Sequence, residues 1–192
     1  MSGRVRGYLG MSLDGRIAGP GDDLEWLHAT RTRRVEEPVP DVGGAWLTYE
    51  AFMADIGVLL MGRATFDVVS AFQHWPYGET PVVVATNRAL PADVPATVTA
   101  AAGSVGVLID AARERSGGGD VYLDGGRLVS AALDAGLLDE LTTTVLPTVR
   151  GPGVGLFEHL GTPRDLDLVN VATDPDGAVQ LTWVPQPDGG SA

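Results

Sequence analysis

Short apolar runs separated by amphipathic segments make up most of the chain. Residues 58–61, 82–85 and 121–123 are three such runs, and their aliphatic composition is typical of strands buried on both faces of a sheet. Between them, apolar residues recur at the spacing of one helix face. The alternation of strands and helices predicts an α/β fold with a mainly parallel sheet and helices on both faces.

Four segments carry the helical spacing. Ser104 is a favourable N-cap and Gly136 a favourable C-terminal stop, so each marks one end of a predicted helix. The predicted helices cover residues 45–56, 62–74, 104–116 and 127–135.

Alternating apolar and polar residues predict further strands toward both ends of the chain. Residues 4–12 alternate and then stop at the turn signal Asp14-Gly15. Asp176-Gly177 separates two alternating segments, which is the pattern of an antiparallel hairpin. We therefore expect antiparallel strands at the C-terminal edge of the sheet. The additional predicted strands cover residues 4–12, 97–100, 141–149, 166–173 and 178–184.

The length of 192 residues fits one domain with its own core. We predict a single domain over residues 1–185 and a flexible tail over 186–192, which is rich in small and polar residues. Residues 18–44 are rich in Gly, Pro and charged residues. This composition predicts a long loop, and loops of this length often cover a functional site.

The net charge of −12 disfavours binding partners that are themselves strongly negative. An acidic balance repels nucleic acid and anionic membrane surfaces, and we interpret Arg31, Arg33 and Arg34 as part of a solvated loop. No apolar run is long enough to span a bilayer, and the N-terminus lacks the layout of a secretion signal. We therefore expect a cytoplasmic protein that binds neither nucleic acid nor membrane.

The chain has no cysteine, which excludes disulfides, thiolate metal ligands and a cysteine nucleophile. Its histidines, which are His28, His74 and His159, are scattered and lack ligand spacing. We expect no metal site.

Three strand ends carry the residue types that bind phosphate. They lie at residues 61–65, 85–88 and 123–127, and two of them open predicted helices. Exposed N–H groups and the helix dipole at such a junction attract anions, and glycine allows close approach to the backbone. The ordinary dinucleotide and P-loop signatures are absent. Glycine and arginine at successive strand ends nevertheless favour a polyphosphate ligand.

These residues also carry a resemblance to a known family. Residues 12–18 (SLDGRIA), followed by Trp26, resemble the opening of the reductase domain of the bifunctional riboflavin-biosynthesis deaminase/reductase. Residues 60–65 resemble the cofactor turn of dihydrofolate reductases, and 124–126 (DGG) the double-glycine turn of both. Leu146-Pro147 with the glycines and apolar residues of 151–157 also fits. The ordered match covers roughly residues 4–184.

The resemblance implies a three-layer, dihydrofolate-reductase-like fold with about eight strands and bound NADPH. The expected cofactor-binding residues are Leu13, Gly62, Arg63, Thr65, Thr86, Asn87, Arg88, Asp124, Gly125, Gly126, Arg127 and Leu128. Ser12, Trp26, Tyr49 and Glu50 are expected on the substrate side. The family also suggests a homodimer paired through C-terminal strands, and a cis peptide between Gly125 and Gly126.

Two positions depart from the family pattern. Tyr8 stands where riboflavin-pathway reductases often carry lysine, and Asp124 where they commonly carry glutamate. The chain looks most like stand-alone reductase-domain relatives. The expected activity is NADPH-dependent hydride transfer to a small heterocyclic compound, similar to dihydrofolate reductase and 5-amino-6-(5-phosphoribosylamino)uracil reductase. A flavin-dependent oxidoreductase and a non-catalytic nucleotide-binding protein are alternatives.

Asp14 is the first candidate for catalysis. It follows the first predicted strand, beside the expected nicotinamide site, where it could supply a proton or orient a water molecule. It could also be a turn former, because Asp-Gly is itself a turn signal.

Overall fold

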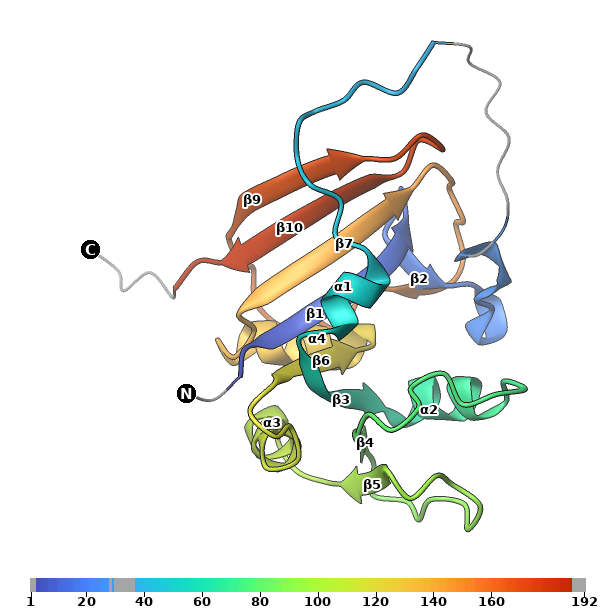
Figure 1. Cartoon of the computed structure of the whole chain (residues 1–192), viewed down its shortest axis with the longest axis vertical. Helices are drawn as coiled ribbons and strands as arrows, with labels where there is room; N and C mark the ends of the chain where they lie inside the picture. Colours follow the sequence, from blue (N-terminus) through green and yellow to red (C-terminus); the bar gives the residue numbers. More distant parts are fainter. Residues whose placement is uncertain (1–2, 28, 30–36, 188–192) are drawn as a thin grey trace.

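The computed structural model describes residues 3–27, 29 and 37–187 and contains a central eight-stranded sheet (Figure 1). The predicted cluster Arg31, Arg33 and Arg34 and most of the predicted tail lie outside these residues. In spatial order, the strands are β5 (Val98–Ala101), β4 (Val82–Ala85), β3 (Ile56–Gly62), β6 (Asp120–Asp124), β1 (Val5–Ser12), β7 (Glu140–Leu146), β10 (Val179–Pro185) and β9 (Leu166–Thr173).

The sheet is parallel from β5 to β7 and antiparallel from β7 to β9. This confirms the predicted mixed sheet with an antiparallel C-terminal edge. The predicted hairpin joins β9 to β10, and its turn contains Gly177 with a φ of 90°. A small second sheet pairs β2 (Arg16–Ala18) with β8 (Val154–Gly155). The sequence pattern did not predict this pair, because each strand is too short to show a period.

Helices cover both faces of the sheet, as Figure 1 shows for α1 and α4. Alternate residues of β3 divide between the two cores: Leu60 packs with α3 and α4, whereas Leu59 and Met61 pack on the side of α1 and α2. Residues buried on both faces explain why this strand reads as one continuous apolar run. The helices are α1 (Tyr49–Met53), α2 (Arg63–Ser70), α3 (Val105–Arg113) and α4 (Gly126–Asp134).

The first predicted helix is shorter than its spacing indicated. Thr48 caps α1 by accepting a hydrogen bond from the N–H of Ala51, so residues 45–48 are not helical. The N–H of Leu47 instead donates to the side-chain oxygen of Gln180, and its C=O accepts from the Gln180 amide. This β10 side chain holds Leu47 as a neighbouring strand would, so the helix starts later than the pattern predicts.

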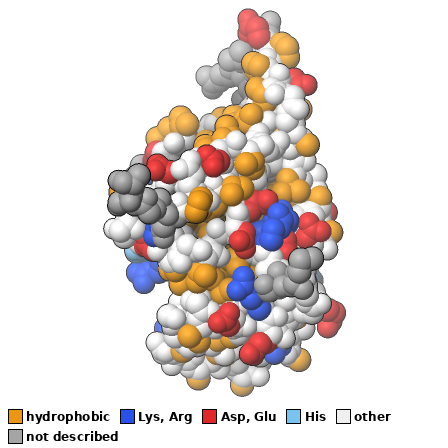
Figure 2. Space-filling model, turned by 90° about the vertical axis from the view of Figure 1, so that its left-hand side faces the viewer, with side chains coloured by type: hydrophobic (Ala, Val, Ile, Leu, Met, Phe, Trp, Pro, Cys, Tyr) orange, Lys and Arg blue, Asp and Glu red, His pale blue; other side chains and the backbone are white. Residues whose placement is uncertain are grey.

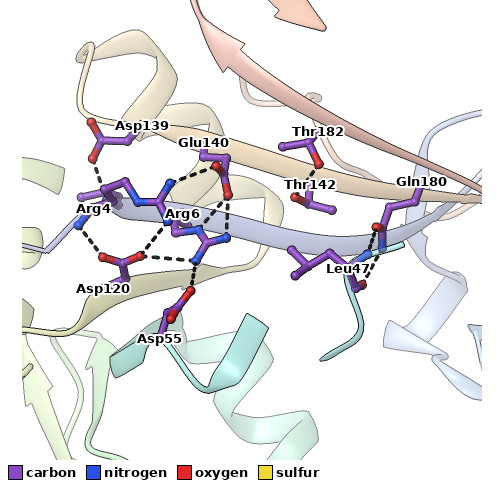
Figure 3. A network of polar contacts seen from close by, with 11 residues as sticks. Arg4, Arg6, Leu47, Asp55, Asp120, Asp139, Glu140, Thr142, Gln180 and Thr182 are labelled. Atoms are coloured by element: carbon purple, nitrogen blue, oxygen red, sulfur yellow. Dashed lines mark hydrogen bonds and ion pairs between the residues drawn. The ribbon is translucent and has the colours of Figure 1, made fainter. Parts of the chain in front are cut away.

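A buried arginine joins the N-terminal ends of the central strands (Figure 3). Arg6 of β1 is 4% exposed. Its guanidinium pairs with Glu140 of β7 at 2.7 Å and with Asp120 of β6 and Asp55 at 3.3 Å each. It also lies 4.9 Å from the Phe52 ring centroid. Figure 2, which faces the side of the N-terminus, shows basic side chains flanked by acidic ones.

Arg6→Ala should destabilise the fold strongly. Removing one partner of a buried ion cluster leaves uncompensated charge, which typically costs about 3–5 kcal/mol. Arg4 contacts Asp120 and Glu140 too, but its side chain is 52% exposed. Arg4→Ala should therefore cost only about 1 kcal/mol or less. Urea unfolding of both variants measures the difference, and equal losses would contradict the structural role of Arg6.

Candidate functional site

The candidate site lies where parallel strands end, at the edge of the sheet opposite the Arg6 cluster. Gly62 of β3 is in register with Ala85 of β4, and Met61 with Asp124 of β6. Parallel strands place their carboxyl ends on one edge, which is where ligands of open α/β sheets bind. The three phosphate-binding segments predicted from the sequence therefore come together.

Two helices begin at this edge without side-chain caps. Gly62 is the N-cap of α2 and Gly125 the N-cap of α4, and neither offers a side chain to the first-turn N–H groups. A Cβ atom at Gly125 would lie 3.0 Å from the Thr65 hydroxyl, so the starts of the two helices are close together. Unpaired N–H groups and two helix dipoles make this junction suited to a polyphosphate.

The double-glycine turn has a different peptide geometry from the one expected. The described residues contain no cis peptide bond, so the predicted cis form between Gly125 and Gly126 is wrong. Gly125 makes the turn through a φ of 110°, a conformation that glycine adopts without strain. At Gly126, an added Cβ would lie 2.8 Å from the Leu156 carbonyl oxygen, so close packing of α4 requires glycine there.

Two arginines meet at the ends of β3 and β4. Arg63 donates to the Asp67 carboxylate at 2.6 Å and to the Ala89 carbonyl at 3.0 Å. Arg88 lies 3.7 Å from the other oxygen of Asp67. Thr86 accepts a hydrogen bond from the Arg88 N–H. The predicted residues are thus brought together, but Asp67, which was not predicted as part of the site, already holds both guanidinium groups.

Other predicted cofactor residues contribute backbone more than side chain. Leu128 belongs to α4, and its side chain is buried in the core. Only its backbone N–H can therefore reach a ligand. Arg127 is exposed, and its Nε donates to His159 at 3.0 Å. Asn87 is exposed next to Thr86, and Leu13 is 69% exposed in the turn after β1.

Asp14 is held firmly in the turn after β1. Its carboxylate accepts hydrogen bonds from the Ser12 hydroxyl at 2.7 Å and from the N–H groups of Arg150 and Gly151 at 2.9 and 2.8 Å. These bonds, with that from Ser12 the largest contributor, hold the pKa of Asp14 well below its usual range. The group is ionised at neutral pH, so it accepts hydrogen bonds rather than donating a proton.

The predicted substrate residues differ in accessibility. Ser12 is fully buried and also accepts from the Arg16 N–H, so its hydroxyl is occupied. Trp26 is buried, and Arg150 lies over its ring at 5.3 Å. Tyr49 is 41% exposed at the start of α1, and Glu50 beside it is exposed.

Asp124 lies among tyrosine rings, and this group was not foreseen as a unit. The Tyr77 hydroxyl lies 3.4 Å from the Asp124 carboxyl group. Burial raises the pKa of Tyr49 and Tyr122, and the charge of Asp124 raises it further. Burial raises the pKa of Asp124 to about 6. A displaced pKa at a strand end marks a functional-site candidate. Sequence reasoning placed Asp124 beside the double glycine but had no signal for Tyr77, which comes from the loop after α2.

Among the residues that the structure describes, no group of three or more His, Asp or Glu side chains is arranged to hold a metal ion. In the same part of the chain, no helix is both long and apolar enough to cross a membrane.

Comparison with known proteins identifies the fold and the family of the chain. The chain is 25% identical to the YyaP protein of Bacillus subtilis over 91% of each chain. A solved riboflavin biosynthesis protein from Shewanella sp. PV-4 is 29% identical, with a TM-score of 0.78 over 96% of this chain and 99% of that one. Dihydrofolate reductase from Enterococcus faecalis, solved with NADP(H), shares the fold at 16% identity, with a TM-score of 0.62 over 97% of this chain and 99% of that one.

The bifunctional deaminase/reductase of Thermotoga maritima also shares the fold. It is 18% identical with a TM-score of 0.63, and the match covers 96% of this chain and 57% of that longer one. The sequence pattern of the RibD C-terminal domain matches residues 5–180. The chain therefore belongs to the RibD C-terminal domain family.

Proposed function

We propose that the protein is an NADPH-dependent reductase that transfers a hydride to a small organic substrate. Its family and fold suggest a reductase-type activity, because proteins with this fold include a 5-amino-6-(5-phosphoribosylamino)uracil reductase and a dihydrofolate reductase solved with NADP(H). The observation that carries the proposal is the meeting of two uncapped helix starts with two arginines at one sheet edge.

The residues present fit such a cofactor in their donor chemistry. Arg63 and Arg88 would hold the adenosine phosphate, with Gly62, Thr65, Thr86 and Asn87 around the ribose. Residues 124–128 would surround the pyrophosphate through their N–H groups, and Leu13 would border the nicotinamide. Bound NADPH would supply the hydride. The chain would fix the geometry and exclude water, which is most of what hydride transfer requires of a protein.

Asp14 would act at the reacting end as an ionised positioning group. Its hydrogen bonds to Arg150 and Gly151 tie the end of β1 to the loop that follows β7. A carboxylate held in this way can orient a water molecule or the substrate. Ser12 would support this role by donating to Asp14.

We also propose a homodimer that forms through the C-terminal strands. β9 is an edge strand, and it carries Leu168 and Val169, which are 50% and 56% exposed. Exposed apolar side chains on an unpaired edge favour association with another surface.

Arg63→Ala should weaken NADPH binding by about 10- to 150-fold, because a charge-assisted hydrogen bond is worth roughly 1.5–3 kcal/mol. NADH lacks the phosphate on the adenine ribose, so its affinity should change much less. Fluorescence titrations of wild type and variant with both cofactors measure this.

Two controls sharpen the result. Arg115→Ala removes an exposed charge outside the site and should leave both affinities unchanged. Asp67→Asn frees both arginines from a competing carboxylate and should tighten NADPH binding. Equal losses for NADPH and NADH in Arg63→Ala would show that Arg63 supports the fold or the pyrophosphate instead.

Asp14→Asn should lower turnover on the order of 10²-fold while changing the NADPH Kd much less, because the amide has one acceptor oxygen in place of two. Stopped-flow measurement of NADPH oxidation, with a substrate found by screening small heterocycles, separates these effects. Asp23→Asn in the same region is the matched control. An unchanged turnover number would leave Asp14 as a turn former.

Light scattering should give twice the mass of the 20.0 kDa chain at micromolar concentration. Leu168→Glu combined with Val169→Glu should shift the protein toward monomer, because charge on an apolar contact opposes its burial. A wild-type monomer would refute the proposed dimer.

A further inference from the structure

We propose that His159 controls whether the Arg127 side chain reaches the bound dinucleotide. The neutral imidazole holds Arg127 beside the turn that follows β8, and the protonated imidazole releases it toward the phosphate-binding edge. The inference rests on the proposed function, because it takes the ligand at this edge to be a dinucleotide. His159 is a positioning residue in this account, since it acts on the ligand through Arg127.

Arg127 stands at the phosphate-binding edge but is directed to another partner. It is the second residue of α4, whose N-cap Gly125 offers no side chain to the first-turn N–H groups. An exposed guanidinium at this position can add its charge to those N–H groups when an anion binds. In the structure, however, its Nε donates a hydrogen bond to the Nε2 atom of His159 at 3.0 Å.

Close packing holds the turn that carries His159 against the start of α4. An added Cβ at Gly126 would lie 2.8 Å from the Leu156 carbonyl oxygen and 3.1 Å from that of Gly155. The Ser130 hydroxyl, one helical turn later, donates to the same Leu156 carbonyl at 3.4 Å. His159 follows this segment directly, so its distance from α4 is fixed by the backbone.

The Nε2 atom of His159 faces two groups that make opposite demands on it. Arg127 can only donate, so it requires a lone pair on Nε2 and places the proton of the neutral ring on Nδ1. An oxygen of Glu158 lies 3.3 Å from the same nitrogen and can only accept. The other Glu158 oxygen accepts from the Gly155 N–H at 3.0 Å, which keeps this carboxylate in place. One nitrogen atom cannot satisfy both neighbours at once.

Protonation of the imidazole decides between these neighbours. A protonated Nε2 donates to Glu158 in an ion pair, no longer accepts from Arg127, and repels its positive charge. Arg127 then loses its partner and can turn toward an anion at the helix start. His159 is 37% exposed and exchanges protons with water, and histidine is the side chain that ordinarily changes charge between pH 5 and 8. Dinucleotide binding should therefore tighten as the pH falls.

Two further charged groups lie near the start of α4. Arg16 of β2 donates to the Gly153 carbonyl at 3.2 Å and keeps its charge at every pH of interest. Asp124 precedes the double glycine, and burial raises its pKa to about 6. Ionisation of Asp124 also disfavours anions as the pH rises, so its contribution must be separated from that of His159. Comparing variants with wild type at the same pH cancels it.

The first test needs no ligand. At about pH 8, nitrogen NMR spectra should show His159 as the Nδ1–H tautomer, whereas exposed His74 should show the Nε2–H form that predominates in water. At about pH 5.5, the Arg127 Nε–H should lose its hydrogen bond and exchange faster with water. Arg127→Met, which removes the donor, should return His159 to the Nε2–H form. An Nε2–H tautomer of wild-type His159 at the higher pH would overturn the proposal.

The second test titrates the protein with NADH. Its pyrophosphate keeps the same charge over this range, whereas the additional phosphate of NADPH titrates near pH 6. His159→Gln supplies an amide oxygen that accepts from Arg127 at every pH. The variant should match wild type at about pH 8 and bind about tenfold more weakly than wild type at about pH 5.5, a difference of about 1.4 kcal/mol. His74→Gln is the matched control and should match wild type at both.

Arg127→Met shows whether the effect passes through Arg127. Alone, it should weaken NADH binding at the lower pH and leave the affinity at the higher pH unchanged. Adding His159→Gln should then have no further effect. An equal loss at both pH values would show that Arg127 binds the dinucleotide whatever the state of His159. A further loss in the double variant would show that His159 contacts the ligand itself. Either result would overturn the proposal.

The two tests also distinguish this inference from the proposed function. If NADH and NADPH both fail to bind while the spectra show the expected tautomer and its change with pH, the reductase function fails and the coupling of His159 to Arg127 stands. If NADPH binds but His159→Gln has the wild-type affinity for NADH at both pH values, the coupling fails and the reductase function stands.

Discussion

The buried guanidinium of Arg6 fixes the centre of the sheet. It bonds carboxylates from β6, from β7 and from the turn before β3, and all of them come from distant parts of the chain. A charge removed from water persists only when its partners surround it, so the relative positions of these strands are tightly specified. Because the strands run parallel, fixing their N-terminal ends also fixes where their carboxyl ends lie, and that edge holds the candidate site.

Sequence patterns were sufficient for the elements whose surroundings are uniform. β3, β4 and β6 are buried on both faces, so each is a continuous apolar run. Elements that depend on one distant partner were not predictable in this way. Leu47 is held by Gln180, a residue 133 positions away, and this contact delays the start of the first helix. The β2–β8 pair likewise depends on two loops meeting and leaves no period in either one.

The same distinction applies to the site. Gly62, Arg63 and Gly125 could be predicted as candidate phosphate-binding residues, because glycine and arginine that follow a strand can be recognised in the sequence alone. The role of Asp14 depends on N–H groups of the loop after β7, which a linear reading could not place. The pairing of Arg63 with Asp67 and the contact of Asp124 with Tyr77 also depend on the tertiary structure. Residue types were therefore easier to predict than the protonation states and partners that determine their chemistry.

The position of β1 has a consequence for protein synthesis. This strand leaves the ribosome well before its neighbours β6 and β7, and Arg6 must wait for Glu140, 134 residues further along. The nascent chain therefore exposes an unpaired central strand with a buried-type arginine until most of the domain has been made. Long-range pairing of this kind slows folding and favours capture by chaperones. The centre of the sheet can close only after residues 140–146 have been made, and β9 and β10 join the sheet later still.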